Sequence, residues 1–360
     1  MYSRVSDMTV INKNKIIGRH TGSLPFALNR ESLKTESFLP VHEQPGNSAH
    51  GQLESSNNFP SFAEKKRKKT YPDSDGERGQ SYGSSRNKCV QLRANPKNEI
   101  IVLDSVTSTN DLAKEILLGK DRFSSLNNDE KIIVPDIDRP FVIISNEQTK
   151  GRGRFGRSFQ SPAGGGIYMT FVHKLRQPVE EVLFLTMISA VAVCRAIETA
   201  CGEQVERPLI KWVNDIYMRK LKVCGILTEG ASGDKGNGIK WILTGIGVNC
   251  FPGAITHELD GIAGSIAEAD AAFSREDLTA DIITNLSELL PDPDPSVLHE
   301  YRDRCIITGK RILVSHLRAN SDSRPARALD ITCDGDLLVE YDDGSREALR
   351  TGEVRLGLDL

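Results

Sequence analysis

Short apolar runs separated by polar turns dominate the chain from about residue 99 onward. The runs 100–103, 141–145 and 166–172 are continuously apolar and short, as buried strands are. Residues 111–118 instead place apolar positions at helical spacing, between a Ser- and Thr-rich capping sequence and the stop signal Gly119. This order predicts a strand, a capped helix and two further strands.

Longer elements follow. Residues 182–200 have the apolar density of a long helix. The runs 209–212, 222–229 and 241–248 are strand-like, and we expect the first two to be neighbours across a turn. Strands at hairpin spacing beside a few helices predict an α+β fold, with a mainly antiparallel sheet and the helices on one side.

The C-terminal part changes character after the Pro-Asp repeat at 291–295, where the helical pattern weakens. Three strand-like runs follow at 311–316, 326–332 and 337–341, and Asp342-Asp343-Gly344 has the composition of a hairpin turn. We therefore expect three parts: a tail (1–97), a large α+β domain (98–304) and a small β-barrel-like domain (305–360).

The first 97 residues are rich in Ser, Asn, Pro, Gly and Lys and carry few sustained apolar patterns, so we expect them to be disordered. Residues 1–98 contain 16 Lys and Arg against 9 Asp and Glu, whereas the other 262 residues contain 30 against 40. The acidic body argues against broad nucleic-acid binding. The basic run 65–69 fits a nuclear-import or nucleic-acid patch, although solvated tail charge is the commoner explanation.

Seven scattered cysteines form no C-x-x-C pair and have no nearby histidines, which favours reduced thiols over disulfides or a zinc site. We identify no apolar run that approaches the roughly 18 residues needed to span a bilayer. The start of the chain also lacks the apolar core of a signal peptide. We expect a cytoplasmic protein without a membrane partner.

Candidate chemistry concentrates in residues 148–157, where three arginines alternate with three glycines directly after a predicted strand. Flexible backbone combined with fixed guanidinium groups suits a phosphate or carboxylate ligand. A surface turn with solvated arginines is the alternative. Lys211, beside Trp212 in an otherwise apolar strand, is weak support by itself, because strand lysines usually face an edge.

Other polar positions have ordinary explanations as well. One member of Ser108-Thr109-Asn110 caps a helix, which leaves the other hydroxyl and amide groups for a polar ligand. Asn214-Asp215 is also typical of a turn. The sequence Gly245-x-Gly247-x-Asn249 fits a strand with close backbone approach, but it lacks the third glycine and the helix of a dinucleotide fingerprint. No Gly-x-Ser-x-Gly nucleophile motif occurs.

Taken in order, these motifs resemble those of the biotin–protein ligases. The sequence has Ser-Thr-Asn, Gln-x-x-Gly-Arg-Gly-Arg-x-Gly-Arg, Ser-Pro, Lys-Trp-x-Asn-Asp, Lys-x-x-Gly-Ile-Leu-x-Glu and Gly-x-Gly-x-Asn. The resemblance is strong over 104–249 and looser to the end, where 349–354 is similar to the family's SH3-like C-terminal domain. The first 97 residues match nothing in the family and show no helix-turn-helix pattern, so DNA binding is not expected.

The resemblance implies a class II synthetase-like catalytic domain and a small C-terminal SH3-like β-barrel. It also implies a two-step reaction: biotin and ATP with Mg²⁺ give biotinyl-5′-AMP, which then acylates a lysine in the biotin carrier domain of a carboxylase. The cationic groups around the reacting carboxylate would be Arg152, Arg154 and Lys211, since two anions must meet there. Asp215 is the weaker candidate for organising the metal.

The remaining roles are also implied by the resemblance. The biotin side would be formed by Ser108, Thr109, Asn110, Gln148, Arg152, Gly153, Arg154 and Lys211. The nucleotide side would be formed by Arg154, Arg157, Phe159, Asn214, Lys222 and Asn249.

Two positions depart from the family pattern: Phe159 stands in place of a common Trp, and Val213 in place of the usual Pro, which would loosen the turn. A lipoate–protein ligase, suggested by the triplet 164–166, and a non-catalytic biotin sensor are the alternatives. A homodimer is compatible with the resemblance.

Overall fold

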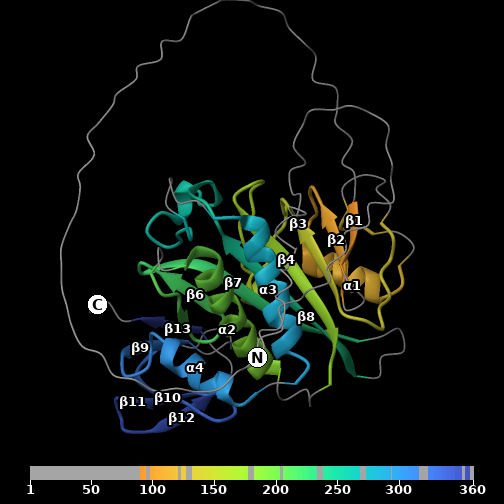
Figure 1. Ribbon diagram of the computed structural model, residues 1–360. Coiled ribbons are helices and arrows are strands. Elements are labelled where there is room, and N and C mark those ends of the chain that lie inside the picture. Colours follow the sequence, from red (N-terminus) through yellow and green to blue (C-terminus); the bar gives the residue numbers. More distant parts are fainter. Residues whose placement is uncertain are drawn as a thin grey trace, which may run out of the picture. The chain divides into compact units, whose positions relative to one another are not determined.

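The computed structural model describes residues 90–94, 98–120, 123–126, 132–176, 182–202, 206–232, 238–267, 273–292, 294–315, 323–350 and 353–356. These residues form a large sheet, a smaller C-terminal sheet and four α-helices (Figure 1). Most of the predicted tail, with its basic run, lies outside the described residues. The structure contradicts the predicted boundary, however, because Val90–Ala94 is a strand that pairs with the next one.

The large sheet has eight strands in the order β1-β2-β3-β4-β8-β7-β6-β5. All neighbouring pairs are antiparallel except β2 and β3, which confirms the mainly antiparallel prediction. The runs 209–212 and 222–229 are not neighbours, because β6 lies between them. The strands are β1 (Val90–Ala94), β2 (Asn98–Leu103), β3 (Phe141–Ser145), β4 (Gly166–Lys174), β5 (Leu209–Lys211), β6 (Asp215–Met218), β7 (Leu221–Ser232) and β8 (Ile239–Asn249).

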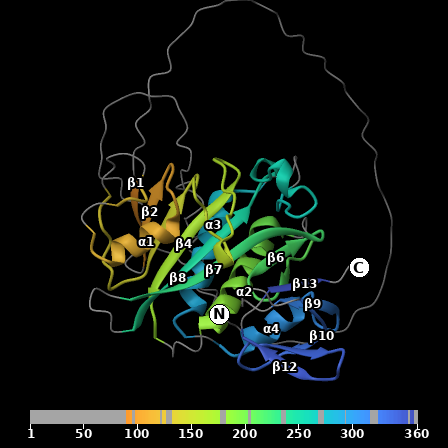
Figure 2. The same ribbon diagram turned by 180° about the vertical axis from the view of Figure 1, so that it is seen from behind.

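Helices cover both faces of this sheet, so the prediction of helices on one side is wrong (Figures 1 and 2). Ile101 and Ile143 pack in the cluster that contains α1, whereas Ile100 and Val142 pack in the cluster that contains α2 and α3. Successive apolar residues in a strand point to opposite faces, and each face then needs a cover. The helices are α1 (Thr109–Leu117), α2 (Val182–Cys201), α3 (Arg275–Leu289) and α4 (Ser296–Arg304).

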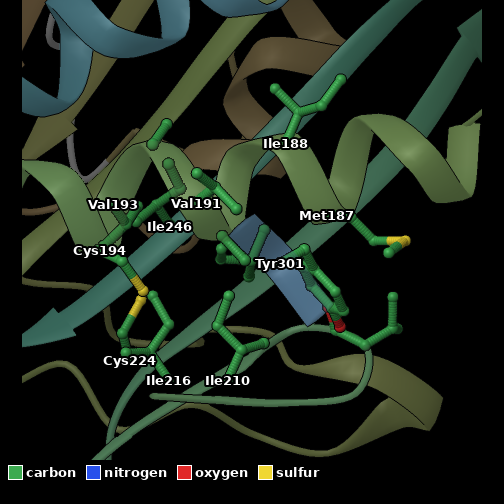
Figure 3. Close-up of a cluster of buried hydrophobic side chains, with 14 of the residues drawn as sticks. Met187, Ile188, Val191, Val193, Cys194, Ile210, Ile216, Cys224, Ile246 and Tyr301 are labelled. Atoms are coloured by element: carbon green, nitrogen blue, oxygen red, sulfur yellow. The ribbon is translucent and has the colours of Figure 1, made fainter. Parts of the chain in front are cut away.

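Helix α2 is long and apolar enough to cross a membrane by length and composition, contrary to the sequence-based expectation. Its side chains nevertheless form the centre of the protein core, where Cys194 points toward Cys224 and Ile216 of the sheet and Ile188 lies on the other side of the helix (Figure 3). Residues Leu185 to Val193 of this helix are buried with at most 7% exposure. Burial against the sheet accounts for the apolar composition of α2.

The C-terminal sheet has five strands in the antiparallel order β12-β11-β10-β9-β13. Three of them confirm predicted runs, and Gly344 makes the predicted turn between β11 and β12 with φ +81°. The short strands β12 and β13 were not predicted; they form the two edges of the described sheet. The bounds are β9 (Arg311–Ser315), β10 (Arg324–Ile331), β11 (Leu337–Tyr341), β12 (Arg346–Leu349) and β13 (Glu353–Leu356).

The cysteines of the described residues are free thiols, as predicted. Cys194, Cys224 and Cys250 are buried, and burial raises the pKa of each of these thiols. They therefore remain protonated and pack as small apolar side chains.

Candidate active site

One pocket gathers almost all of the predicted site residues, although they come from five separate parts of the sheet and its loops. Its walls are the start of α1, the Arg/Gly loop after β3, the end of β5, the start of β7 and the middle of β8. Including its open mouth, the empty space is about 970 Å³. The predicted residues that line it are Ser108, Thr109, Asn110, Gln148, Arg152, Gly153, Arg154, Arg157, Phe159, Lys211, Asn214, Asp215 and Lys222.

At the α1 end of the pocket, neutral polar groups form hydrogen bonds with one another. Ser108 caps α1 by accepting a hydrogen bond from the Asp111 N–H at 3.4 Å. The Thr109 N–H and hydroxyl both donate to Gln148 Oε1, at 2.9 and 3.2 Å. Gln148 Nε2 in turn donates to Ser161 Oγ at 2.9 Å. This end of the pocket is therefore fixed before any ligand arrives, and it suits an uncharged polar ligand group.

Charged side chains form a hydrogen-bonded network along the same wall of the pocket, beside α1. Asn110 Nδ2 donates to Glu229 Oε2 at 2.8 Å, and Lys114 Nζ donates to Glu229 Oε1 at 2.7 Å. Burial would raise the pKa of Glu229, but these two hydrogen bonds, together with the charges of Lys114 and Arg152, lower the pKa. Arg152 forms an ion pair with Asp111 and lies 3.6 Å from Glu229. The hydrogen bond to Asp111 raises the pKa of Arg152 against the effect of burial, so the guanidinium is held as a fixed positive charge.

The Arg/Gly loop folds back over the pocket. Arg154 donates to Asn214 Oδ1 at 3.0 Å, and its guanidinium lies 4.6 Å from the centre of the Phe155 ring. Phe155 has a left-handed backbone with φ 57° and is 45% exposed, so its ring is one of the exposed parts of the loop. The Gly153 N–H donates to Arg157 O at 2.7 Å, so in this structure the loop itself uses that donor.

The opposite wall carries Lys211 at the end of β5, where it lies opposite Asp215 in the β5–β6 register. Its ammonium is 6.0 Å from the centre of the Tyr217 ring. Asp215 forms an ion pair with Lys222 at 2.7 Å. Asn214 is anchored by its Nδ2 to Ile226 O at 2.7 Å, so it can present its oxygen to Arg154.

Glycines form the floor of the pocket. A Cβ on Gly245 would lie 2.4 Å from Asn110 Oδ1, and one on Gly247 would lie 2.4 Å from an edge carbon of the Phe159 ring. A Cβ on Gly225 of the neighbouring strand would come within 3.3 Å of the same ring. The predicted close backbone approach is therefore confirmed: the strand surface is flat so that an aromatic ring can lie on it.

The structure does not bring Asn249 into the pocket lining, so its nucleotide role stays a prediction. Asn249 is buried, and its Nδ2 donates to Gly264 O at 3.2 Å while its carbonyl accepts from the Ile266 N–H at 2.9 Å. Its side chain therefore supports the loop after β8. Sequence reasoning missed several aliphatic lining residues, because an apolar side chain carries no signal for a pocket: Met169, Ile226, Leu227, Ile246 and, from the C-terminal sheet, Val354.

Among the described residues that line the pocket, Asp215 is the single carboxylate. Among the residues that the structure describes, no group of three or more His, Cys, Asp or Glu side chains is arranged around a common metal position. His173 does not line the pocket, and burial lowers its pKa to about 4. It is neutral and structural at pH 7.

Known proteins are similar to this chain over the region that carries most of the site residues. Residues 104–249 match the Biotin/lipoate A/B protein ligase family. The bifunctional ligase/repressor BirA of Bacillus subtilis is 37% identical over 131 residues, which are 36% of this chain and 38% of the relative. The biotin–acetyl-CoA-carboxylase ligase of Paracoccus denitrificans is 34% identical over 128 residues, which are 36% of this chain and 52% of the relative. The chain thus spans about half, or less, of these relatives' length.

The fold has solved counterparts. The crystal structure of the biotin protein ligase from Aquifex aeolicus aligns with a TM-score of 0.53 and 19% identity, over 72% of this chain and 98% of that one. The same protein in complex with biotin and ATP aligns with a TM-score of 0.52 and 20% identity, over the same shares. Residues 104–249 are thus similar in sequence to the biotin/lipoate A/B protein ligase family, and the fold is similar to that of a solved biotin protein ligase.

Proposed function

We propose that this chain is an ATP-dependent biotin–protein ligase that acts through a biotinyl-5′-AMP intermediate. The observation that carries the proposal is the content of one pocket. It combines a neutral, pre-bonded polar end at Thr109 and Gln148 with three cationic side chains: Arg152 near that end, Arg154 in the loop and Lys211 on the opposite wall. A ligand with a neutral ring system and a carboxylate tail would fit a pocket that has both a neutral polar end and these cationic side chains.

On the biotin side, Ser108, Thr109, Asn110 and Gln148 supply hydroxyl and amide groups for the polar atoms of the ring. Their mutual hydrogen bonds hold these groups in place, so little ordering is needed on binding. Gly153 approaches the ligand only through its backbone.

The first step joins two anions. A carboxylate oxygen of biotin attacks the α-phosphorus of ATP, the bond to the bridging oxygen breaks, and pyrophosphate leaves. Arg152, Arg154 and Lys211 would stabilise the negative charge that accumulates on the phosphate. Arg154 is already oriented by Asn214, so its charge needs no reorganisation at the moment of reaction.

The nucleotide would lie against the Phe159 ring, which itself covers the glycine floor. Phe159 offers a ring face for the base, while Arg157, Asn214 and Lys222 offer donors for the phosphates and ribose. Mg²⁺ usually reaches such sites bound to the substrate phosphates with one or two protein carboxylates. Asp215 fits as one such ligand, although its pairing with Lys222 in this structure would have to open.

The second step transfers the acyl group to a lysine of a carboxylase's biotin carrier domain. The neutral amine attacks the acyl carbon, the bond to the phosphate oxygen breaks, and AMP leaves. No histidine is among the described lining residues. We infer that the reactivity of the mixed anhydride and the orientation of the carrier drive this step. We also propose that the C-terminal sheet is an SH3-like domain, which contributes Val354 to the pocket.

Pyrophosphate release tests the proposal. The purified chain should release pyrophosphate from ATP with biotin, much less with lipoate, and not without an acyl acid. Addition of a biotin carrier domain should then yield the biotinylated carrier. Preference for lipoate would identify a lipoate ligase, and biotin binding without pyrophosphate release would identify a sensor; either outcome overturns the proposed function.

A further inference from the structure

The backbone that carries Lys211 and Asn214 is held in place by a part of the chain that lies about 90 to 120 residues further on. The Ile306 N–H donates to Ile210 O at 2.9 Å. The Trp212 indole N–H donates to Gly335 O at 3.1 Å, and the Tyr301 hydroxyl donates to Val213 O at 3.1 Å. Three residues of this short segment are thus bonded to α4, its following loop and the β10–β11 turn.

Tyr301 is fully buried. It has 0% exposure and points from α4 toward the segment after β5, with its oxygen at the loop (Figure 3). A buried hydroxyl is costly unless it is hydrogen-bonded. Burial raises the pKa of this phenol well above its ordinary value, so it remains a donor. A phenylalanine at this position would give the same apolar packing. The distinct contribution of Tyr301 is the hydrogen bond from its hydroxyl to the Val213 carbonyl.

Val213 needs this contact because a valine has no ring to restrict its φ angle. The sequence suggested a loosened turn here, but Val213 is 3% exposed and its carbonyl is bonded. The next residue, Asn214, accepts from Arg154, and the preceding pair is Lys211 and Trp212. A shift of the Val213 carbonyl would therefore move both Lys211 and Asn214, which belong to the same wall of the pocket.

We propose that Tyr301 is a positioning residue for this site, acting through Val213 on Asn214, Arg154 and Lys211. This inference rests on the proposed ligase function for its kinetic consequence. Tyr301 does not line the pocket, so it would affect the chemistry without touching a substrate. A misplacement of reacting groups by a fraction of an ångström lowers a rate on the order of tenfold.

The kinetic test compares Tyr301→Phe with Tyr341→Phe. Tyr341 is also buried and donates at 2.5 Å, but to Glu347 within the C-terminal sheet, away from the pocket. For Tyr301→Phe we expect kcat for pyrophosphate release to fall about tenfold. Biotin affinity without ATP should stay within about twofold, because the Thr109–Gln148 end has no contact with Tyr301. Tyr341→Phe should change neither quantity.

A second readout does not depend on catalysis. The chain has two tryptophans, so in a Trp241→Phe background the fluorescence reports Trp212 alone. Trp241 donates its own indole N–H to Ile137 O at 3.2 Å and does not line the pocket, so its loss should leave activity intact. In this background, Tyr301→Phe should increase acrylamide quenching of Trp212 about twofold by local loosening, whereas Tyr341→Phe should not.

The outcomes separate the two proposals. A wild-type chain that releases no pyrophosphate overturns the proposed function, and the quenching experiment then still decides whether Tyr301 positions the segment. An active wild type with equal kcat and equal quenching in Tyr301→Phe overturns the positioning role. Failure of Tyr301→Phe to fold, with Tyr341→Phe folded, also overturns it, because it shows a global rather than a local role for the hydroxyl.

Discussion

Replacement of Lys211 by alanine should remove most adenylate formation while leaving the protein folded. Lys211 ends the short strand β5 and is partly exposed at the pocket wall. Its ammonium lies 6.0 Å from the centre of the Tyr217 ring. Truncation of a partly exposed side chain at the end of a strand usually costs about 1 kcal/mol or less. That loss is small compared with a typical total stability of roughly 5–15 kcal/mol.

The catalytic loss should be much larger. An ammonium about 4 Å from an anion gains about 4 kcal/mol of Coulomb energy at an effective dielectric constant of about 20. After desolvation, a charge-assisted hydrogen bond contributes about 1.5–3 kcal/mol net. If this interaction forms with the developing phosphate charge, its removal lowers the rate by about tenfold to somewhat over a hundredfold.

The assay is pyrophosphate release at saturating biotin and ATP, together with the thermal midpoint of unfolding. Lys174→Ala is the matched control, because Lys174 also ends a strand and is 48% exposed, but it pairs with Asp138 outside the pocket. We expect the two variants to unfold at similar temperatures and only Lys211→Ala to lose activity. Near-normal pyrophosphate release from Lys211→Ala would refute the assignment of this lysine to the reacting phosphate.

Four further predictions concern the site and its surroundings. Arg154→Ala should break the bond to Asn214 and open the loop, so that free biotinyl-AMP escapes and labels bystander lysines; a variant that labels only the carrier would show that the loop is not the retaining lid. A chain that begins at residue 90 should ligate as fast as the full chain in vitro, since all described lining residues lie after it; loss of activity on folded protein would assign the tail a role. The transfer rate should rise with pH between about 7 and 9 as the acceptor amine deprotonates, with the same slope in His173→Ala; a lower limb near a histidine pKa that disappears in the variant would reveal a general base. The folded pKa of His173, about 4, lies below its ordinary 6.5. The neutral side chain therefore makes its full contribution to the free energy of unfolding above pH 6.5, and this contribution is lost as the pH falls through 4. A non-titrating His173→Phe should remove up to about 3 kcal/mol of this acid dependence, as measured by denaturant unfolding.

Local chemistry along the sequence determined much of this protein. Continuous apolar runs predicted β2, β3 and β4, because a strand buried on both faces needs no alternation. Ser108 and Gly119 predicted the ends of α1, because capping depends on groups within one turn of the helix. The cluster of Arg and Gly after β3 predicted an anion site for the same reason: its cost in backbone entropy and buried charge is visible locally.

Only the tertiary structure decided how these pieces combine. The insertion of β6 between β5 and β7, and the helices on both faces, depend on which edges and faces find partners. Asn249 does not line the pocket; its side-chain amide donates a hydrogen bond to Gly264 O, and no local sequence pattern reveals that bond. Tyr301 reaches Val213 across 88 residues of sequence. Contacts between distant residues are selected by burial and hydrogen bonding in the folded chain, so a periodicity or a motif carries no trace of them.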